Sequence, residues 1–323
     1  MSEYNFPSEI EYDKTYKKLK NKKGHNWYKF LKSFDEQGRQ GFVGILSILE
    51  KRKCVYKTSQ YYNHLVRQEW NIMRSLKKIR NCCPHFCYGY KILSHKADLD
   101  YRKKDNIFKL NRKKNIEIET LLMQYLEGME DFTHYIENNG KLEKIYSIIK
   151  QVLCALSVAQ NKLHFCHYDL HSSNILLTKC NPDLVILSKN GSNNSICIPT
   201  FGMMPKIIDY GFSYTKDMEN RNFYATLAHT NVGFLSCTND FISDLKLFLV
   251  TTSYDVNNSF KSDNSCKYRN IIKSIFKPLD IDWEAGWDNY THSGASDVLI
   301  SELEEISDTS HLFSKYDHIC IDI

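Results

Sequence analysis

The sequence is poor in proline and glycine, and it has no long apolar run. Only 6 prolines and 13 glycines occur among 323 residues, and no segment approaches the roughly 18–20 apolar residues of a membrane-spanning helix. The first twenty residues are polar and of mixed charge, so we expect no signal peptide. We therefore expect an intracellular protein, cytoplasmic or nuclear, with no membrane contact and with eleven free cysteine thiols.

A clear metal-binding pattern of cysteine and histidine is also missing. The nearest candidate is the segment CCPHFC, which contains Cys82, Cys83, His85 and Cys87. A structural zinc site needs two ligand pairs at regular spacing, and no second pair accompanies this one. We interpret these residues as buried or half-buried thiols, with zinc as the alternative.

The net charge of +5 is distributed unevenly. Residues 51–116 contain 18 basic and 4 acidic side chains, a net charge of +14, whereas residues 117–323 carry a net charge of −11. This split predicts two lobes that meet different partners. The basic part could contact nucleic acid, with binding that falls steeply with salt. The alternative is that the charge only solvates a surface.

The first part of the sequence has the pattern of strands with one helix. We expect an irregular lead-in over residues 1–30, then strands over residues 41–49 and 53–59, which are rich in β-branched and aromatic residues. Residues 62–79 repeat apolar side chains at helical spacing. Two further strands, CYGYKIL and IEIETLLMQYL, flank a basic insertion over about residues 95–115.

After Gly128 the pattern becomes mainly helical. Residues 141–163 predict a strong amphipathic helix, and the segments NDFISDLKLFLVTT and YRNIIKSIF also look helical. The segments DLVIL and MPKIIDYGFSY predict strands. We therefore expect a lead-in over residues 1–30, an N-lobe over 31–126 and a C-lobe over 127–323.

One dense polar segment stands between apolar runs of the second part. It reads HYDLHSSN, from His167 to Asn174, and a later strand ends in Asp209-Tyr210-Gly211. These motifs resemble the catalytic loop H-R-D-L-x-x-x-N and the D-F-G of the protein kinase superfamily. The resemblance implies an α+β, bilobal kinase-like fold, with a small β-rich N-lobe containing one key helix and a larger, mainly helical C-lobe.

The resemblance also implies the roles of three polar side chains in the second part. Asp169 would orient the substrate hydroxyl and accept its proton, whereas Asn174 and Asp209 would hold Mg²⁺, which prefers hard oxygen ligands. The alternative is that Asp169 and Asn174 cap a turn and Asp209 only ends a strand.

Two charged residues of the first part match the ion pair of the family. Lys57 would hold the phosphates of ATP and would itself be set by Glu69. Val55 and Lys57 share a strand face, as the family pattern requires, and Glu69 is the only glutamate between residues 51 and 116. The alternatives are that both are ordinary surface charges, or that Lys51 or Lys53 takes the place of Lys57.

The nucleotide-binding segments match less closely. Gly38, Gly41 and Gly44 depart from the spacing G-x-G-x-x-G, although close backbone approach to phosphates needs glycine here. We assign Gly38 and Gly41 to this contact, with a plain hairpin turn as the alternative. In LLMQYLEG the resemblance places the backbone of Gln124 to Leu126 against adenine.

The departures from the family pattern point to one branch. Tyr168 replaces the usual Arg, His171 replaces a common Lys, and no A-P-E follows Asp209. Together with Ile-Ile-Asp-Tyr, these features are most similar to the haspin-type kinases and their large-DNA-virus relatives. Asp244 resembles the helix Asp that braces the catalytic loop, with a solvent-facing Asp as the alternative. The many Lys, Asn, Ile and Tyr residues suit a virus with an AT-rich genome.

The resemblance predicts an ATP- and Mg²⁺-dependent serine/threonine protein kinase. The acidic second lobe would favour protein substrates with basic segments. Two other functions stay open. One is a small-molecule kinase of the aminoglycoside or choline type, and the other is a pseudokinase that binds partners without catalysis.

Overall fold

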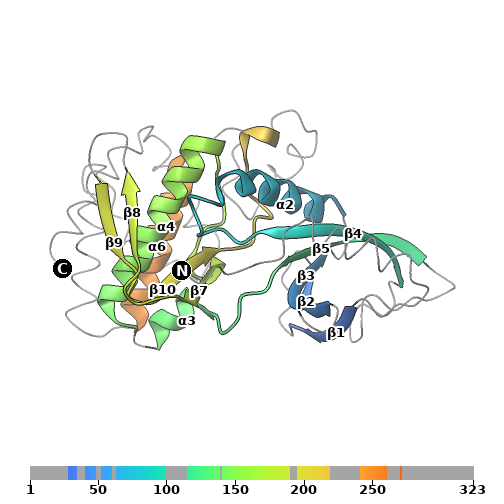
Figure 1. Ribbon diagram of the computed structural model, residues 1–323, viewed down its shortest axis with the longest axis horizontal. Coiled ribbons are helices and arrows are strands. Elements are labelled where there is room, and N and C mark those ends of the chain that lie inside the picture. Colours follow the sequence, from blue (N-terminus) through green and yellow to red (C-terminus); the bar gives the residue numbers. More distant parts are fainter. Residues whose placement is uncertain are drawn as a thin grey trace. The chain divides into compact units, whose positions relative to one another are not determined.

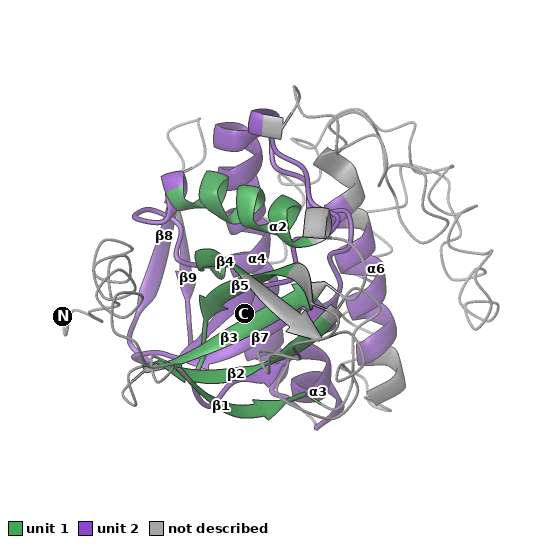
Figure 2. Cartoon of the chain, turned by 90° about the vertical axis from the view of Figure 1, so that its right-hand side faces the viewer, with its two compact units in different colours: residues 1–77, 87–126 green, residues 78–86, 127–323 purple. Residues whose placement is uncertain are grey.

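The computed structural model has an α+β architecture whose N-terminal part is rich in β-sheet, as the sequence predicts (Figure 1). By its contacts the chain divides into two compact units, unit 1 with residues 1–77 and 87–126, and unit 2 with residues 78–86 and 127–323 (Figure 2). The structure describes residues 28–34, 41–48, 52–59, 63–98, 115–138, 140–189, 195–218, 241–259 and 270.

Unit 1 is built on one five-stranded antiparallel sheet, whose strand order is β1-β2-β3-β5-β4. Helix α2 packs on β3, β4 and β5, and the short 3₁₀ helix Lys77–Ile79 follows it. The elements are β1 (Tyr28–Ser33), β2 (Gly41–Ile48), β3 (Arg52–Ser59), α2 (Asn63–Leu76), β4 (Gly89–Asp98) and β5 (Asn115–Gln124).

The predicted strands and helix of this unit are confirmed, with one difference at the start. Strand β1 begins at Tyr28, so the irregular lead-in expected up to residue 30 ends earlier than predicted. Strands β4 and β5 pair from end to end, as arms of an extended hairpin. The rest of the lead-in, residues 1–27, and residues 99–114 of the basic insertion lie outside the described residues.

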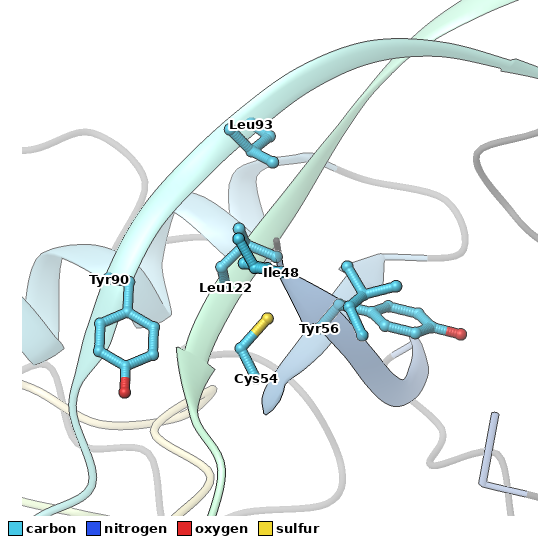
Figure 3. Packing of buried hydrophobic residues seen from close by; sticks show 7 residues of the cluster. Ile48, Cys54, Tyr56, Tyr90, Leu93 and Leu122 are labelled. Carbon is cyan, nitrogen blue, oxygen red and sulfur yellow. The ribbon is translucent and has the colours of Figure 1, made fainter. Parts of the chain in front are cut away.

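Alternation along the strands gives the sheet of unit 1 two different faces. Cys54 and Tyr56 point into a hydrophobic cluster with residues of β2, β4 and β5 (Figure 3). Burying each large apolar side chain there contributes roughly 1.5–3 kcal/mol. Gly44 lies opposite Tyr56, and a Cβ atom at Gly44 would come within 2.7 Å of the Tyr56 ring. Lys57 lies on the other face, toward α2.

Unit 2 contains two small sheets and three α-helices among its described residues. The sheets have the strand orders β10-β7-β6 and β8-β9. The strands are β6 (Glu130–Asp131), β7 (Ile175–Lys179), β8 (Val185–Lys189), β9 (Ser195–Pro199) and β10 (Met203–Ile207). The helices are α3 (Phe132–Glu137), α4 (Leu142–Leu163) and α6 (Phe241–Ser259), with 3₁₀ turns η3 (Ser172–Asn174) and η4 (Lys216–Met218).

The long helix α4 is the strongest element that the sequence predicts in unit 2. Its apolar face packs on β9 and β10, where Ser147 donates to the carbonyl of Pro199 (2.6 Å) and Gln151 to that of Met203 (3.1 Å). The helix ends at His164, whose φ of 50° is left-handed and turns the chain away from the helix axis. Residues 165–174 follow directly, so α4 sets where the polar loop begins.

The remaining predictions for the second part have different outcomes. Helix α6 and strands β8 and β10 are confirmed. The sequence did not predict β6, β7, β9 or α3, so the described part of unit 2 is richer in strands than expected. The predicted helix over residues 268–276 lies outside the described residues apart from residue 270. No helix in the described segments is long and apolar enough to cross a membrane.

Part of the cysteine-rich segment is buried, including Cys83 and His85. Burial raises the pKa of the Cys83 thiol to about 12 and lowers the pKa of His85 to about 4. His85 uses its ring Nδ1–H to donate to the carbonyl of Pro205 (3.1 Å). Cys87 is buried, whereas Cys82 is exposed, contrary to the expectation of burial. These features favour a packing role, because a zinc ligand must be a thiolate.

Candidate active site

The polar loop of unit 2, residues 167–174, begins next to a short antiparallel pairing of two backbone segments. Cys166 and Tyr214 exchange two backbone hydrogen bonds, of 3.0 and 2.7 Å. The rings of Phe165, His167 and Tyr210 then pack together, with centroids 5.7–6.3 Å apart. The loop and the segment around Asp209, about forty residues later, are thus held side by side by buried aromatic packing.

A buried carboxylate braces the backbone of the loop. Asp244, at the start of α6, is 0% exposed and accepts from the backbone N–H groups of His167 (2.6 Å) and Tyr168 (2.7 Å). The predicted bracing role of Asp244 is therefore confirmed, and the solvent-facing alternative is wrong. Tyr168 has a φ of 61° and buries its ring with Cys166 and Tyr214. Two hydrogen bonds donated to one carboxylate stabilise this sparsely populated conformation.

Asp169 and Asn174 come together as the sequence predicts. The side-chain Nδ2 of Asn174 donates to the backbone carbonyl of Asp169 (2.8 Å) and lies 3.5 Å from its carboxylate Oδ2. Asn174 also donates to Nε2 of His171 (3.0 Å), and that nitrogen lies 3.9 Å from Oδ1 of Asp169. The Asn174 amide group therefore closes the loop and aligns both neighbours. Asn174 does hold a turn, but the Asp169 carboxylate remains about one-third exposed, as a group that meets a ligand must be.

Asp209 lies just beyond the end of β10 and close to His171. Its φ of 60° is left-handed, and the chain beside it is fixed by Tyr210, whose hydroxyl donates to the Ile207 carbonyl (2.5 Å). The backbone N–H of Ile208 donates to the Asn174 carbonyl (3.0 Å). Burial lowers the pKa of His171, and the Asp209 carboxylate opposes this by raising it. His171 is thus a neutral acceptor beside two carboxylates at neutral pH.

These side chains have the chemistry that Mg²⁺ requires. The side-chain NH₂ group of Asn174 donates to the Asp169 carbonyl and to His171 Nε2. Its Oδ1 accepts no hydrogen bond among the described residues. The carboxylate of Asp209 and the amide oxygen of Asn174 are hard oxygen donors, and such ligands suit Mg²⁺. The residues therefore fit the predicted ion.

A second group of hydrogen bonds holds η3, and sequence reasoning missed it. The Ser172 hydroxyl donates to the Asp255 carboxylate of α6, and Thr133 of α3 contacts the hydroxyls of Ser172 (2.7 Å) and Ser173 (2.9 Å). Burial raises the pKa of Asp255 to about 6. Asp244 falls within the predicted helical segment NDFISDLKLFLVTT, whereas Asp255 lies beyond its end, so no signal in the sequence pointed to this contact.

In unit 1 the predicted ion pair is present and buried. Nζ of Lys57 lies 2.9 Å from Oε2 of Glu69, and the two residues are 8% and 1% exposed. The alternative of two surface charges is therefore wrong. A second pair, missed from the sequence, joins α2 to β5: Arg67 donates two hydrogen bonds, each of 2.5 Å, to the carboxylate of the buried Glu119. The two pairs fix α2 on the sheet.

The structure describes only some of the residues predicted to bind the nucleotide through their backbone. Gly38 lies outside the described residues, and Gly41 opens β2 opposite Ser59. The backbone N–H of Gln124 donates to the Tyr88 carbonyl (3.0 Å), and its own carbonyl accepts from the Cys87 thiol (3.9 Å). Contact of this backbone with adenine stays a prediction. Leu126 is buried at the end of unit 1.

Comparison with known proteins gives three informative relatives, although no family model matches the chain. Protein 038R of Invertebrate iridescent virus 3 is 24% identical over 89% of this chain and 59% of its own length. The probable kinase 098L of the same virus is 23% identical over 65% of this chain and 38% of its own length. The serine/threonine-protein kinase haspin of Bos taurus is 28% identical over 54% of this chain and 18% of its own length.

The chain therefore spans about three-fifths or less of the length of these relatives. The relatives named as kinases and the viral relatives are those that the motifs predicted, since one is a haspin and two come from a large DNA virus. The resemblance of this chain to the protein kinase superfamily, on its haspin-like and large-DNA-virus branch, is thereby confirmed.

Proposed function

We propose that this protein is an ATP-dependent protein kinase that transfers the γ-phosphoryl group to serine or threonine of a protein substrate. In this proposal unit 1 corresponds to the N-lobe of a bilobal kinase-like fold and unit 2 to the C-lobe. The observation that carries the proposal is the arrangement of Asp169 and Asn174 on a loop braced by Asp244, with Asp209 close to His171 of that loop. The relatives named as kinases support it.

In the proposed reaction the substrate hydroxyl attacks the γ-phosphorus. A bond forms between the hydroxyl oxygen and phosphorus, the bond to the β,γ-bridging oxygen breaks, and ADP leaves. Asp169 orients the hydroxyl and accepts its proton, and the amide of Asn174 holds the Asp169 backbone in place during this transfer. Bound Mg²⁺ would neutralise charge on the phosphate oxygens, and Asn174 and Asp209 are the residues that would hold it.

Lys57 is the residue proposed to hold the phosphates of ATP. Its ammonium group is fixed by Glu69, so it needs little rearrangement to meet an anionic ligand. Arg67 and Glu119 hold the helix that carries Glu69. The pseudokinase alternative predicts loss of the catalytic residues, and it is disfavoured because the sequence retains Lys57, Asp169, Asn174 and Asp209. The poor match of the glycine loop keeps this alternative open.

The decisive experiment is transfer of labelled γ-phosphate from ATP, with Mg²⁺, to a mixture of basic proteins. The native chain is compared with Asp169→Asn, which preserves side-chain shape and removes the proton acceptor. Loss of a general base lowers the rate by about 10²–10⁴-fold. Both proteins should have the same urea midpoint and bind nucleotide equally. Equal transfer by the two proteins would exclude Asp169 from this role.

A small-molecule kinase is the second candidate, because kinases of the aminoglycoside or choline type often carry histidine at the position of His171. In this structure His171 accepts from Asn174 within the loop. If neither protein phosphorylates the basic mixture but nucleotide binding is intact, the same assay with aminoglycosides and choline distinguishes this candidate from a non-catalytic binding module.

The charge distribution suggests the class of substrate and a possible second partner. Residues 117–323 carry a net charge of −11, and we propose that they favour basic segments around the acceptor. Replacing basic flanks of a peptide by acidic ones should raise its KM; no change would contradict this. Residues 51–116, with a net charge of +14, are proposed to contact nucleic acid. Affinity for an oligonucleotide that did not fall with salt would contradict that contact.

A further inference from the structure

Helix α6 carries two carboxylates that face the same part of the protein. Asp244 and Asp255 are eleven residues apart, which is about three helical turns with an offset of only about 20°. Asp244 holds the backbone just before Asp169, whereas Asp255 accepts from Ser172, just before Asn174. One rigid helix therefore contacts the loop at both ends.

The second contact is part of a closed arrangement of side chains. Ser172 is 2% exposed, and its hydroxyl joins the Asp255 carboxylate on α6 to Thr133 on α3. Thr133 also contacts the hydroxyl of Ser173. Asp131 caps the N-terminus of this helix, and its side chain accepts from the backbone N–H of His134 (2.7 Å). The turn η3, which ends at Asn174, is thus fixed between two helices.

We propose that Asp255 is a positioning residue for Asn174. By accepting the Ser172 hydroxyl it fixes η3, and this sets the direction in which Asn174 presents its side-chain oxygen. The inference rests on the proposed function for the identity of the ion that Asn174 would hold. The positioning itself concerns only residues of unit 2.

The electrostatic surroundings of Asp255 support this role. Burial raises the pKa of Asp255 to about 6, the hydrogen bond from Ser172 opposes this rise, and the negative charges of Glu137 on α3 and Asp131 on β6 add to it. A carboxylate is therefore an unfavourable choice here for stability alone. Side chains whose pKa is strongly shifted by burial and by neighbouring charges are concentrated at functional sites.

The test uses Asp255→Ala, Asp255→Asn and Ser172→Ala, with Asp183→Ala as a control that removes an exposed carboxylate of the same unit. Two quantities are measured: the Mg²⁺ concentration for half-maximal transfer, and hydrogen exchange of the Asn174 and Ile208 amides. Their hydrogen bonds, to His171 and Asn174 respectively, report directly on the turn.

Loss of a residue that orients a metal ligand typically weakens metal binding by 10–100-fold. We expect Asp255→Ala to raise the Mg²⁺ requirement by about tenfold and to speed exchange of both amides. Ser172→Ala should match it, the double variant should add little, and Asp255→Asn should be near native because its amide oxygen still accepts the hydroxyl. The control should change neither quantity.

Two outcomes would overturn the inference. One is an unchanged Mg²⁺ requirement with unchanged amide exchange in Asp255→Ala. The other is a rise confined to the KM of a basic peptide, which would make Asp255 a substrate contact. If the native chain transfers no phosphate, the proposed function fails, and amide exchange in the same variants still decides whether Asp255 positions the turn.

Discussion

Replacing Asp244 by asparagine is expected to lower the free energy of unfolding by about 2–4 kcal/mol. The buried carboxylate accepts two backbone N–H groups, at 2.6 and 2.7 Å. Asparagine offers one neutral oxygen and one NH₂ group, so the first hydrogen bond weakens by about 1 kcal/mol. The second N–H meets a donor and is left buried without an acceptor, which costs about 1–3 kcal/mol.

The measurement is urea denaturation of native protein and Asp244→Asn, followed by phosphate transfer under conditions where both are folded. Asp217→Asn is the matched control, because Asp217 forms an exposed pair with Lys78 (2.5 Å) and such pairs contribute little. We expect transfer to fall as well, since the N–H groups concerned precede Asp169 directly. A loss below 1 kcal/mol, equal to that of the control, would refute the reasoning.

Three other substitutions test separate parts of the structure. Lys57→Met should lower the free energy of unfolding by about 3–5 kcal/mol, because the buried Glu69 carboxylate loses the ammonium group that lies 2.9 Å from it. Lys57→Met with Glu69→Leu should restore much of this stability in a denaturation series. Gly44→Ala should lower the free energy of unfolding by about 1–3 kcal/mol, since its Cβ meets the Tyr56 ring, and an unchanged urea midpoint would contradict that packing. The folded-state pKa of Asp255, about 6, lies above its ordinary value of 3.8, so the fold binds the proton more tightly and loses stability as the pH rises from about 4 to 6. Asp255→Asn should remove this loss and be about 1–2 kcal/mol more stable than the native chain at pH 8, after allowance for solvent screening, with no such gain at pH 4.

The local parts of the fold could be predicted from the sequence because each has its own signal. The period of apolar residues predicted α2, α4 and α6, and β-branched runs predicted β2, β3 and β5. Strands β6 and β7 and helix α3 are short, with two to six residues, and too few positions to establish a period. These elements depend on their neighbours, as Glu130 and Asp131 do on β7.

The residues of the candidate site also differ in whether the sequence alone identifies them. Asp169, Asn174 and Asp209 stand in motifs whose order and spacing can be read directly. Asp255 and Glu119 cannot be found in this manner, because their partners Ser172 and Arg67 lie 83 and 52 residues away in the sequence. Only the folded chain shows which of the 38 acidic residues accept these hydrogen bonds.

The distance in sequence between the polar loop and α6 has a consequence for the order of folding. The hydrogen bonds to Asp244 and Asp255 span 76 to 83 residues, so the loop cannot take its final shape until α6 has been synthesised and has docked. At about 5–20 residues per second, that interval lasts about 4–16 seconds on the ribosome. Contacts of this separation also close slowly. A nascent chain released before α6 would contain every motif residue of the loop and still lack its geometry.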